Sequence, residues 1–460
     1  MRRKSMRLLA AFTCSALLVV ACSDDESTDD TTEETTGETT GDTTEETTGD
    51  TTEETTAGGG AWAVNTDDCI DPDAANALIE GEINIGSVMP LTGDTSADEA
   101  FAPVKDGWLA YMDYANEQGI LGDITINAAV EDDKYAAEET PGAVSKLIDA
   151  GTQVISAIVG SPNNLAVRDA LNEECIPQLA NMTGLPAWGA DAEEYPWTSG
   201  QMIPYDVESR VYMQALKDQG ATTVGLFYVN TDFGLSYADT IKAEAADFGL
   251  EVVAEETIDP TDGAPPVGQL TSIAEANPDA IIAVPLGAGC VTFLGALAEK
   301  KAQTAGWEPY TYVTNTCASA LILTLAGANA DGLYTSNQLI DVTDPDNASD
   351  PDVQAYLEFM EGLGKGDLVT TASAGWSAAE VTVAIIKQAM ESPEGLTRAS
   401  IINAARNLNY EPTLARPGVV YKTNGLEDAF PAESLQVLQY DADSKTFTEI
   451  GDLITSFESS

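Results

Sequence analysis

Residues 82–119 read EINIGSVMPLTGDTSADEAFAPVKDGWLAYMDYANEQG, and this stretch predicts a strand, a long loop and a helix in succession. Apolar residues lie among small and polar ones from 83 to 88, and Pro90 ends the predicted strand. Apolar residues then recur at helical spacing from 104 to 115, and Gly119 is placed to cap the helix. Ligands of open α/β sheets bind at the carboxyl ends of the strands, so the loop is expected to form one wall of a small-molecule site.

The same alternation of strand and helix continues through most of the chain. A loop region over 188–204, rich in tryptophan, proline and acidic residues, divides it into two similar halves. We therefore predict an α/β fold of two doubly wound lobes with parallel central sheets and a hinged cleft between them. The predicted strands are 83–88, 124–130, 154–159, 176–180, 223–229, 251–256, 280–284 and 310–314, with a closing hairpin of 434–440 and 445–450. The predicted helices are 104–118, 136–150, 164–174, 205–219, 234–248, 266–276, 290–305, 351–361, 376–390 and 397–406.

The N-terminus carries features of an export signal with a lipid attachment site. Four basic residues precede an apolar run, 8–21, that is too short to cross a bilayer as a stable helix. The run leads into Leu-Val-Val-Ala-Cys at 18–22, which resembles the lipobox of bacterial lipoproteins. We predict a signal peptide over 1–21 and a diacylated Cys22 that anchors the exported protein to the outer face of the cell membrane. The alternative is a plain secretory signal with a cysteine there by chance.

Residues 22–60 are predicted to form a flexible tether. From 23 to 56 the segment repeats TTEETTGD with small variations and holds 14 acidic and no basic residues. Threonine methyls are its only apolar groups, so it cannot bury enough surface to offset chain entropy and is expected to stay disordered. A tether of this kind suits an anchored protein.

The chain is strongly acidic, with 76 acidic and 20 basic residues and a formal charge of −56. Without the signal and the tether, the body still carries a formal charge of −46. Such a surface repels nucleic acid and anionic lipid, which excludes functions that depend on binding polyanions. The acidity is otherwise typical of a solvated surface suited to high salt or to solubility.

Six cysteines divide by position. One lies in the signal, and Cys22 is the lipidation candidate. The other four allow three pairings, and an exported protein occupies a compartment in which disulfides persist. We predict Cys290–Cys317, because each residue directly follows a predicted strand of the second lobe, and this leaves Cys69–Cys175. A zinc site is disfavoured because the chain has no CxxC spacing and no histidine.

Several segments of the body carry a resemblance to a known family. They are INIGSVMPLTG, KDGWLAYMDYANEQG, VEDDKY, AIVGSPNN, FYVNTDFGLSYADTIKAEAADFGLEVVAEETIDP and PDAIIAVPLGAG, in this order within 82–452. The body resembles the branched-chain amino-acid-type, leucine-binding-protein-like substrate-binding proteins of ABC transporters, which are type I periplasmic binding proteins. The resemblance implies a monomer of two lobes, joined by a multi-strand hinge, that closes on one small ligand and delivers it to permease subunits. It implies a first lobe over 82–200 and 336–425 and a second lobe over 201–335, to which 426–460 returns through the hinge and adds strands.

The resemblance also assigns ligand-binding roles. Residues 160–163, Gly-Ser-Pro-Asn, match the family loop in which a serine and the first amides of a helix bind the ligand's carboxylate, and a helix N-terminus suits an anion. Thr183 falls where a hydroxyl bridges the amino group, Phe101 where an aromatic ring covers the ligand, and Phe233 where tyrosine is frequent. The structural alternatives are a helix cap for the serine, a turn for Thr183 and core packing for Phe101. The candidate ligand-binding residues are Phe101, Ser161, Asn163, Met182, Thr183, Asp232, Phe233 and Thr316, and no cofactor is implied.

One departure from the family's pattern concerns the ligand. Amino-acid binders of this family have an acidic residue just after the last strand of the second lobe, where it pairs with the ligand's ammonium group. Residues 314–318 read Thr-Asn-Thr-Cys-Ala and contain no carboxylate. An enclosed ammonium group without a counter-charge is strongly unfavourable, unless Asp206, Asp232 or Glu99 supplies that charge. The ligands that remain are an amino acid paired in that way, a neutral amide, a urea-like molecule or a carboxylate.

An enzyme is disfavoured by what the sequence lacks. Without histidine the chain cannot form Ser-His-Asp or Cys-His systems, and neither GxGxxG after a strand nor GxxxxGK[ST] occurs. Adjacent carboxylates such as those at 132–133 carry little weight in a chain with 76 acidic residues. The closer alternative to a transport protein is a sensor, in which the same two-lobed fold presents its ligand to a receptor.

Overall fold

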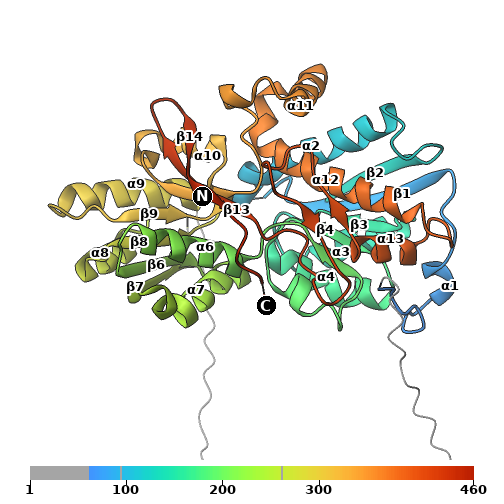
Figure 1. Cartoon of the computed structure of the whole chain (residues 1–460), viewed down its shortest axis with the longest axis horizontal. Coiled ribbons are helices and arrows are strands. Elements are labelled where there is room, and N and C mark those ends of the chain that lie inside the picture. The colour runs from blue at the N-terminus through green and yellow to red at the C-terminus, as the bar shows by residue number, and fades with distance from the viewer. Residues whose placement is uncertain (1–61, 94–95, 261–262, 460) are drawn as a thin grey trace, which may run out of the picture. The chain divides into compact units, whose positions relative to one another are not determined.

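The computed structural model describes residues 62–93, 96–260 and 263–459, which belong to one compact unit spanning 59–460. The predicted signal peptide, Cys22 and the tether lie outside the described residues. Two large β-sheets, each covered by helices on both faces, make up the unit (Figure 1). Each sheet with its helices is called a lobe, numbered in the order in which the chain enters it. The predicted α/β fold of two doubly wound lobes is confirmed.

The first sheet is parallel throughout, and its strands alternate their residues between two covered faces. Ile83 and Ile85 of its first strand in the chain pack under one layer of helices, whereas Val88 of the same strand packs under the other. The strands, from edge to edge, are β2 (Thr125–Asp132), β1 (Glu82–Met89), β3 (Val154–Ser156), β4 (Gln178–Asn181) and β5 (Thr198–Gly200). The helices are α2 (Ser96–Glu117), α12 (Val369–Ala389) and α13 (Arg398–Ala405) on one face and α3 (Thr140–Asp149) and α4 (Ser161–Glu173) on the other.

Helices α2 and α12 pack with their backbones in direct contact. A Cβ atom at Gly107 would lie 1.8 Å from the carbonyl oxygen of Ala372, and one at Gly375 would lie 1.9 Å from that of Val104. Both positions therefore require glycine. Among the described helices, one stretch, 366–389, is long and apolar enough to cross a membrane, but most of it is buried in the core of the first lobe.

The second sheet is mixed. Its strands from β10 to β7 run parallel, whereas β13 is antiparallel to β10 and β14 is antiparallel to β13. The predicted closing hairpin, 434–440 and 445–450, is present as β13 and β14, and it adds two antiparallel strands to the edge of an otherwise parallel sheet. The strands, from edge to edge, are β14 (Thr446–Ile454), β13 (Leu435–Asp441), β10 (Tyr334–Asn337), β9 (Tyr310–Val313), β8 (Ala280–Val284), β6 (Thr223–Val229) and β7 (Glu251–Ile258).

Helices cover the second sheet on both faces as well. Residues of β6 alternate between them, because Leu226 packs with one layer and Phe227 with the other. The helices are α6 (Tyr205–Asp218) and α7 (Asp232–Glu244) on one face and α8 (Val267–Ala276), α9 (Ala288–Gln303) and α10 (Ala320–Ala326) on the other. Smaller elements are α1 (Pro72–Ala75), α5 (Ala187–Ala190), α11 (Pro351–Gly362), β11 (Asn409–Tyr410) and β12 (Tyr421–Lys422).

Within the described residues the chain passes between the two sheets three times, after β5, after β10 and before β13. The second passage is tied to a later segment of the chain, because the amide of Arg416 donates to the carbonyl oxygen of Gln338 (2.8 Å) and Leu339 forms an isolated antiparallel bridge with Ala415. These passages form the multi-strand hinge.

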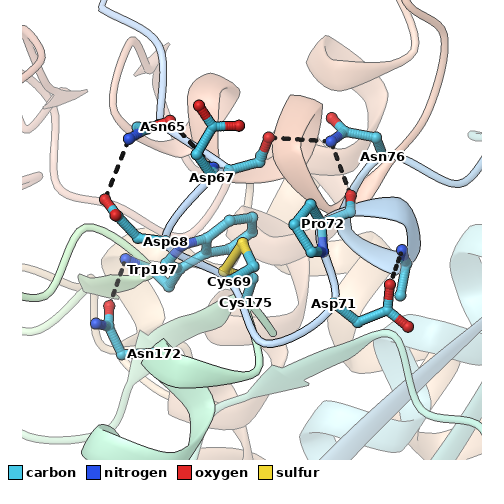
Figure 2. The surroundings of a disulfide bond; sticks show 12 residues. Asn65, Asp67, Asp68, Cys69, Asp71, Pro72, Asn76, Asn172, Cys175 and Trp197 are labelled. Atoms are coloured by element: carbon cyan, nitrogen blue, oxygen red, sulfur yellow. Dashed lines mark hydrogen bonds between the residues drawn. A yellow bond between two sulfur atoms is a disulfide. The ribbon is translucent and has the colours of Figure 1, made fainter.

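Both predicted disulfides are present. Cys69–Cys175, with Cα atoms 5.5 Å apart, ties the segment before β1 to the residues that follow α4. Figure 2 shows this bond beside Trp197, whose amide donates to Asn172 Oδ1 (3.4 Å). Cys290–Cys317, with Cα atoms 5.7 Å apart, joins the start of α9 to the short 3-10 turn η2 (Asn315–Cys317) that follows β9.

Candidate functional site

A cavity of about 340 Å³ lies between the two lobes. The first lobe lines it with the starts of α2, α4 and α12 and with the loop after β4. The second lobe lines it with the loops after β8 and β9, with α10 and with the β13–β14 hairpin. Residues of the hinge, at 201–202 and 337–343, complete the lining. The loops at the carboxyl ends of the parallel strands meet here, where α/β sheets bind their ligands.

The N-terminus of α4 opens into the cavity. Gly160 caps this helix with a φ of 100°, and a Cβ atom there would lie 2.6 Å from Asn163 Oδ1 and 2.7 Å from the ring of Tyr135. Glycine is needed for both the conformation and the space. Gly160 and Ser161 line the cavity, so the Ser161 amide, which has no partner within the helix, lies beside it, whereas the next residue, Pro162, has no N–H. This positive end of the helix favours an anion.

Three hydroxyl groups form a buried chain beside the helix end. The Tyr205 hydroxyl donates to Thr183 Oγ1 (3.3 Å), which lies 2.6 Å from Ser161 Oγ. Either hydroxyl of the Thr183–Ser161 pair can be the donor. When Thr183 donates, the Ser161 proton is available to a group in the cavity. Burial raises the pKa of Tyr205, so the hydroxyl keeps its proton at neutral pH.

Asn163 lies behind the helix end, outside the cavity lining. Its Nδ2 donates to Asp133 Oδ2 (2.8 Å) and to Thr140 Oγ1 (3.1 Å), and Thr140 also donates to Asp133 (2.8 Å). The amide of Tyr135 donates to the other oxygen of Asp133 (3.1 Å). Burial raises the pKa of Asp133, and these hydrogen bonds oppose the rise. Asp133 therefore fixes α4 and Tyr135 relative to each other.

Most of the remaining lining is apolar. The ring of Phe101, from the first lobe, stacks near Tyr135 with centroids 6.4 Å apart. The ring of Phe233, from the second lobe, packs against Tyr205 with centroids 5.1 Å apart. Both lobes thus contribute aromatic surface. The apolar lining residues are Phe101, Val104, Val159, Met182, Met202, Phe233, Leu286, Ala318, Leu323, Leu339, Ile340, Val342, Ala374, Leu438 and Phe447.

The structure brings most of the predicted ligand-binding residues together. Thr183 and Asn163 are buried directly behind the lining and act through Ser161 and Asp133. Asp232 is exposed at the first residue of α7 and does not line the cavity. The next residue, Phe233, faces the cavity instead, because the side chains of successive helical residues point about 100° apart. Those that line the cavity are Phe101, Ser161, Met182, Phe233 and Thr316.

The other acidic residues expected to balance an ammonium group are not placed for it. Asp206 is buried in an ion pair with Arg210 (2.9 Å) and does not line the cavity. The side chain of Glu99 lies outside the described residues. Among the lining residues that the structure describes, Asp341 is the one carboxylate, and it accepts bonds from the amide (2.9 Å) and the hydroxyl (2.7 Å) of Thr343.

Two cationic residues, Arg416 and Lys445, also line the cavity. Arg416 donates to the carboxylate of Glu449. Burial lowers the pKa of Arg416, and the neighbouring charges of Glu449 and Asp341 oppose this effect. Lys445 is exposed. The cavity therefore holds no cation that is both buried and unpaired among its described lining residues.

Sequence reasoning missed Tyr135, Tyr205, Gln201 and Gln338, which all line the cavity. Tyr135 ends the segment VEDDKY, which runs from the end of β2 into the following loop. Tyr205 follows a proline and is the first residue of a helix. These positions, beside the end of a strand and at the start of a helix, were the available signals. The two glutamines directly follow β5 and β10, two strands that the apolar pattern does not predict.

Two α/β lobes that enclose a cavity of ligand size at a hinge define a two-lobed ligand-binding protein. The sequence pattern of the periplasmic binding proteins matches residues 82–445, which is most of the chain. The chain belongs to the periplasmic binding protein family and has its type I fold. This is a family of binding proteins rather than enzymes, and it implies a location outside the cytoplasm.

Solved structures share the fold. A branched-chain amino acid ABC transporter from Thermus thermophilus with bound valine is 16% identical, with a TM-score of 0.70 over 82% of this chain and 97% of that one. A fatty acid ABC transporter substrate-binding protein from Thermomonospora curvata is 20% identical, with a TM-score of 0.69 over 82% and 94%. A possible leucine/isoleucine/valine-binding protein from Rhodopirellula baltica SH 1 is 16% identical, with a TM-score of 0.64 over 83% and 98%. No curated protein sequence matches the chain.

Proposed function

We propose that the protein is the extracytoplasmic substrate-binding component of an ABC importer, which holds one small ligand between its lobes and delivers it to the permease. The observation that carries this proposal is the cavity of about 340 Å³ at the hinge. Its volume falls in the usual range of small-molecule sites, and both lobes contribute to its walls. The names of the structural neighbours, which include transporter components for valine-type amino acids and fatty acids, support the same role.

The ligand that suits this cavity has one polar end and an apolar body. The polar end faces the hydroxyl and amide of Ser161 at the start of α4, with the Tyr135 hydroxyl also in the lining. The apolar body faces the aromatic and aliphatic walls. A urea-like molecule is polar on all sides and would lose hydrogen bonds against those walls, which disfavours it. Amino acids, carboxylates and aliphatic amides can have one polar end and an apolar body, so they remain candidate ligands.

The N-terminus supports a location at the membrane. The basic residues, the apolar run and Leu-Val-Val-Ala-Cys at 18–22 favour export followed by lipid attachment at Cys22. The acidic segment 22–60 then serves as a tether that lets the ligand-binding body reach the permease. An anchored substrate-binding protein stays close to its transporter, which raises its effective concentration there.

A thermal-shift panel of amino acids, aliphatic carboxylates, their amides and urea tests ligand binding. A ligand at 100 times its Kd adds about 2.7 kcal/mol to the free energy of unfolding. We expect at least one compound with a polar end and an apolar body to raise Tm and to bind with one-to-one stoichiometry in calorimetry. The Ser161→Phe variant, which places a ring in the cavity, should lose that binding. Unchanged binding by this variant would contradict the interlobe site.

Uptake measurements separate a transport protein from a sensor. Cells that lack the gene should no longer take up the ligand at concentrations near its Kd, and the gene on a plasmid should restore uptake. Normal uptake in the deletion strain would instead favour a sensor that presents the ligand to a receptor.

A further inference from the structure

We infer that the ligand is a monocarboxylate with an apolar body and without an ammonium group, such as an aliphatic acid or its 2-hydroxy derivative. This inference rests on the proposed function and specifies the chemistry of its ligand. Three features of the cavity carry it. One end offers donors, the unpartnered acceptors elsewhere are neutral, and the carboxylates in and behind the walls, Asp341 included, already have partners.

The donor end suits a carboxylate. The Ser161 hydroxyl lines the cavity and can donate to the ligand, while Thr183 and Tyr205 hold it in place from behind. The Tyr135 hydroxyl has no partner among the described residues, and burial raises its pKa, so it remains a donor at neutral pH. The Ser161 amide adds a further donor at the positive end of α4. A carboxylate can accept several such bonds at once, and bonds to an ionised acceptor are the strong ones.

The buried carboxylates near the cavity are bound to other groups. Asp133 accepts bonds from Asn163, Thr140 and the amide of Tyr135. Asp206 pairs with Arg210. Neither of these carboxylates lines the cavity.

Glu208, in α6, is also fully engaged. It accepts bonds from the hydroxyls of Tyr212, Tyr237 and Ser336 and from the amide of Asn315. It lies behind the loop that follows β9, where the amino-acid binders place their counter-charge, but it does not line the cavity.

Asp341, the one carboxylate among the described lining residues, accepts two bonds from Thr343 at one oxygen, and its charge interacts with that of Arg416. An ammonium group on the cavity side would therefore meet no carboxylate without a partner among the described residues.

Apart from Asp341, the side-chain acceptors that line the cavity among the described residues are neutral. Gln201 and Gln338 are 2% and 5% exposed, and their amide oxygens have no partner among the described residues. The hydroxyl of Thr316 is also buried and unpartnered within the described part of the chain. These atoms can accept a hydrogen bond from a ligand hydroxyl. They bring no negative charge, so they cannot balance an ammonium group taken out of water.

Three acids with the same carbon skeleton test the inference: 4-methylpentanoate, 2-hydroxy-4-methylpentanoate and L-leucine. They differ only in the group at carbon 2, which is hydrogen, hydroxyl or ammonium. Titration calorimetry at pH 7.5 gives the Kd of each. We expect the first two to bind at least 30-fold more tightly than L-leucine. The difference should narrow at a pH high enough to deprotonate the amino group of leucine, because the exclusion is electrostatic.

The outcomes separate this inference from the proposed function. L-Leucine binding as tightly as the two other acids would overturn the inference and leave the transport role in place. Failure of these acids and of straight-chain acids from hexanoate to decanoate to bind would also overturn it. If 4-methylpentanamide then bound instead, the transport role would still stand, whereas failure of the whole panel would count against both.

A reciprocal variant tests the cause of the exclusion. Thr316→Asp places a carboxylate on the loop after β9, where it can face an ammonium group. We expect it to improve the Kd of L-leucine relative to that of 4-methylpentanoate by at least 10-fold. An unchanged ratio in a variant with wild-type Tm would contradict the electrostatic basis of the inference.

Discussion

Ser161 is the member of a chain of three hydroxyls that lies at the N-terminus of α4 beside the cavity. Tyr205 donates to Thr183, and Thr183 lies 2.6 Å from Ser161. All three residues are buried, so removal of one leaves its neighbour without a partner where water does not compensate. Thr183, which lies behind the cavity lining, is therefore expected to affect ligand binding as much as Ser161, which lies in the lining.

Ser161→Ala and Thr183→Ala should each weaken binding of the ligand by about 1–3 kcal/mol, the usual cost of stranding a buried partner. Titration calorimetry with the tightest carboxylate measures the effect. Ser272→Ala, on an exposed position of α8, is the matched control and should bind like the wild type. Wild-type affinity in both the Ser161 and the Thr183 variant would place the polar end of the ligand elsewhere.

A second feature at the scale of single residues is the protonation of the buried Glu208 carboxyl group. The side chain is fully buried, and burial raises the pKa of its carboxyl group, whereas the bonds it accepts oppose the rise. The two tyrosines that donate to it each have another acceptor in reach. Tyr212 lies 2.9 Å from the carbonyl oxygen of Val313, and Tyr237 lies 3.0 Å from Thr314 Oγ1. The surroundings can therefore accommodate a protonated carboxyl group.

The raised pKa makes stability depend on pH. The folded protein binds the proton of Glu208 more tightly than the unfolded chain does. Binding of this proton therefore stabilises the fold in full below the ordinary glutamate pKa, and that stabilisation is lost as the pH rises from there through the raised pKa of the folded state. Glu208→Gln removes the titration and keeps the shape. The free energy of unfolding of this variant, measured with urea from pH 4 to pH 8, should therefore rise relative to that of the wild type as the pH increases. A constant or falling difference would contradict the raised pKa.

At the scale of elements, the Cys290–Cys317 bond joins two segments that line the cavity. Leu286 precedes the start of α9, and Thr316 lies in the turn that carries the second cysteine. The bond thus holds the loops after β8 and β9 together. The other disulfide, Cys69–Cys175, joins the segment before β1 to the residues that follow α4, and neither of its cysteines lines the cavity.

This difference makes the two disulfides a matched pair. Replacing either pair with alanine should lower the free energy of unfolding by about 2–4 kcal/mol. The Cys290→Ala/Cys317→Ala variant should also raise the Kd of the ligand at least fivefold, because its loops are no longer fixed. The Cys69→Ala/Cys175→Ala variant should keep the wild-type Kd at a temperature at which both variants are folded. Equal Kd values in the two variants would show that the second-lobe bond does not shape the site.

The predictable elements are those with strong apolar patterns. β6 and β8 are buried on both faces and read as apolar runs, so the sequence predicts them within a few residues. β5 and β10 are short and polar, and they exist because a neighbouring strand pairs with them. The predicted helix 136–150 begins later, at Thr140, because Lys134 and Tyr135 take φ values of 57° and 58° in a turn.

The same distinction applies to the site. The loops at the carboxyl ends of the strands could be predicted, and with them Ser161 and Phe233, because the alternation of elements fixes where those loops meet. Which side chain of a loop faces the cavity depends on tertiary structure, so Phe233 lines it and Asp232 does not. Gln201 and Gln338 lie in hinge passages, which have no local pattern of their own.

At the scale of the whole molecule, the ligand-binding body is proposed to work beside a membrane. Cys22→Ser should release the protein from the membrane fraction of the producing cells, because the residue proposed to carry the lipid is lost. Immunoblots of membrane and soluble fractions measure this, with Cys290→Ala/Cys317→Ala as a control that keeps the anchor. Continued membrane association of the Cys22→Ser variant would contradict lipid attachment at that residue.

The two lobes contribute different parts of one cavity. The first lobe supplies the end of α4 with Ser161 and Thr183, and the second supplies Tyr205, Phe233 and the loops after β8 and β9. A ligand held there contacts both lobes at once, so its binding is coupled to the hinge. The central claim is that one carboxylate ligand occupies this interlobe cavity with its charged end on the first lobe.

A crystal structure with 4-methylpentanoate bound tests that claim most directly. The structure should show one molecule in the cavity, with a carboxylate oxygen within about 3.2 Å of Ser161 Oγ and the aliphatic end between Phe101 and Phe233. A ligand bound outside the cavity, or bound inside it with its carboxylate turned away from α4, would contradict the claim.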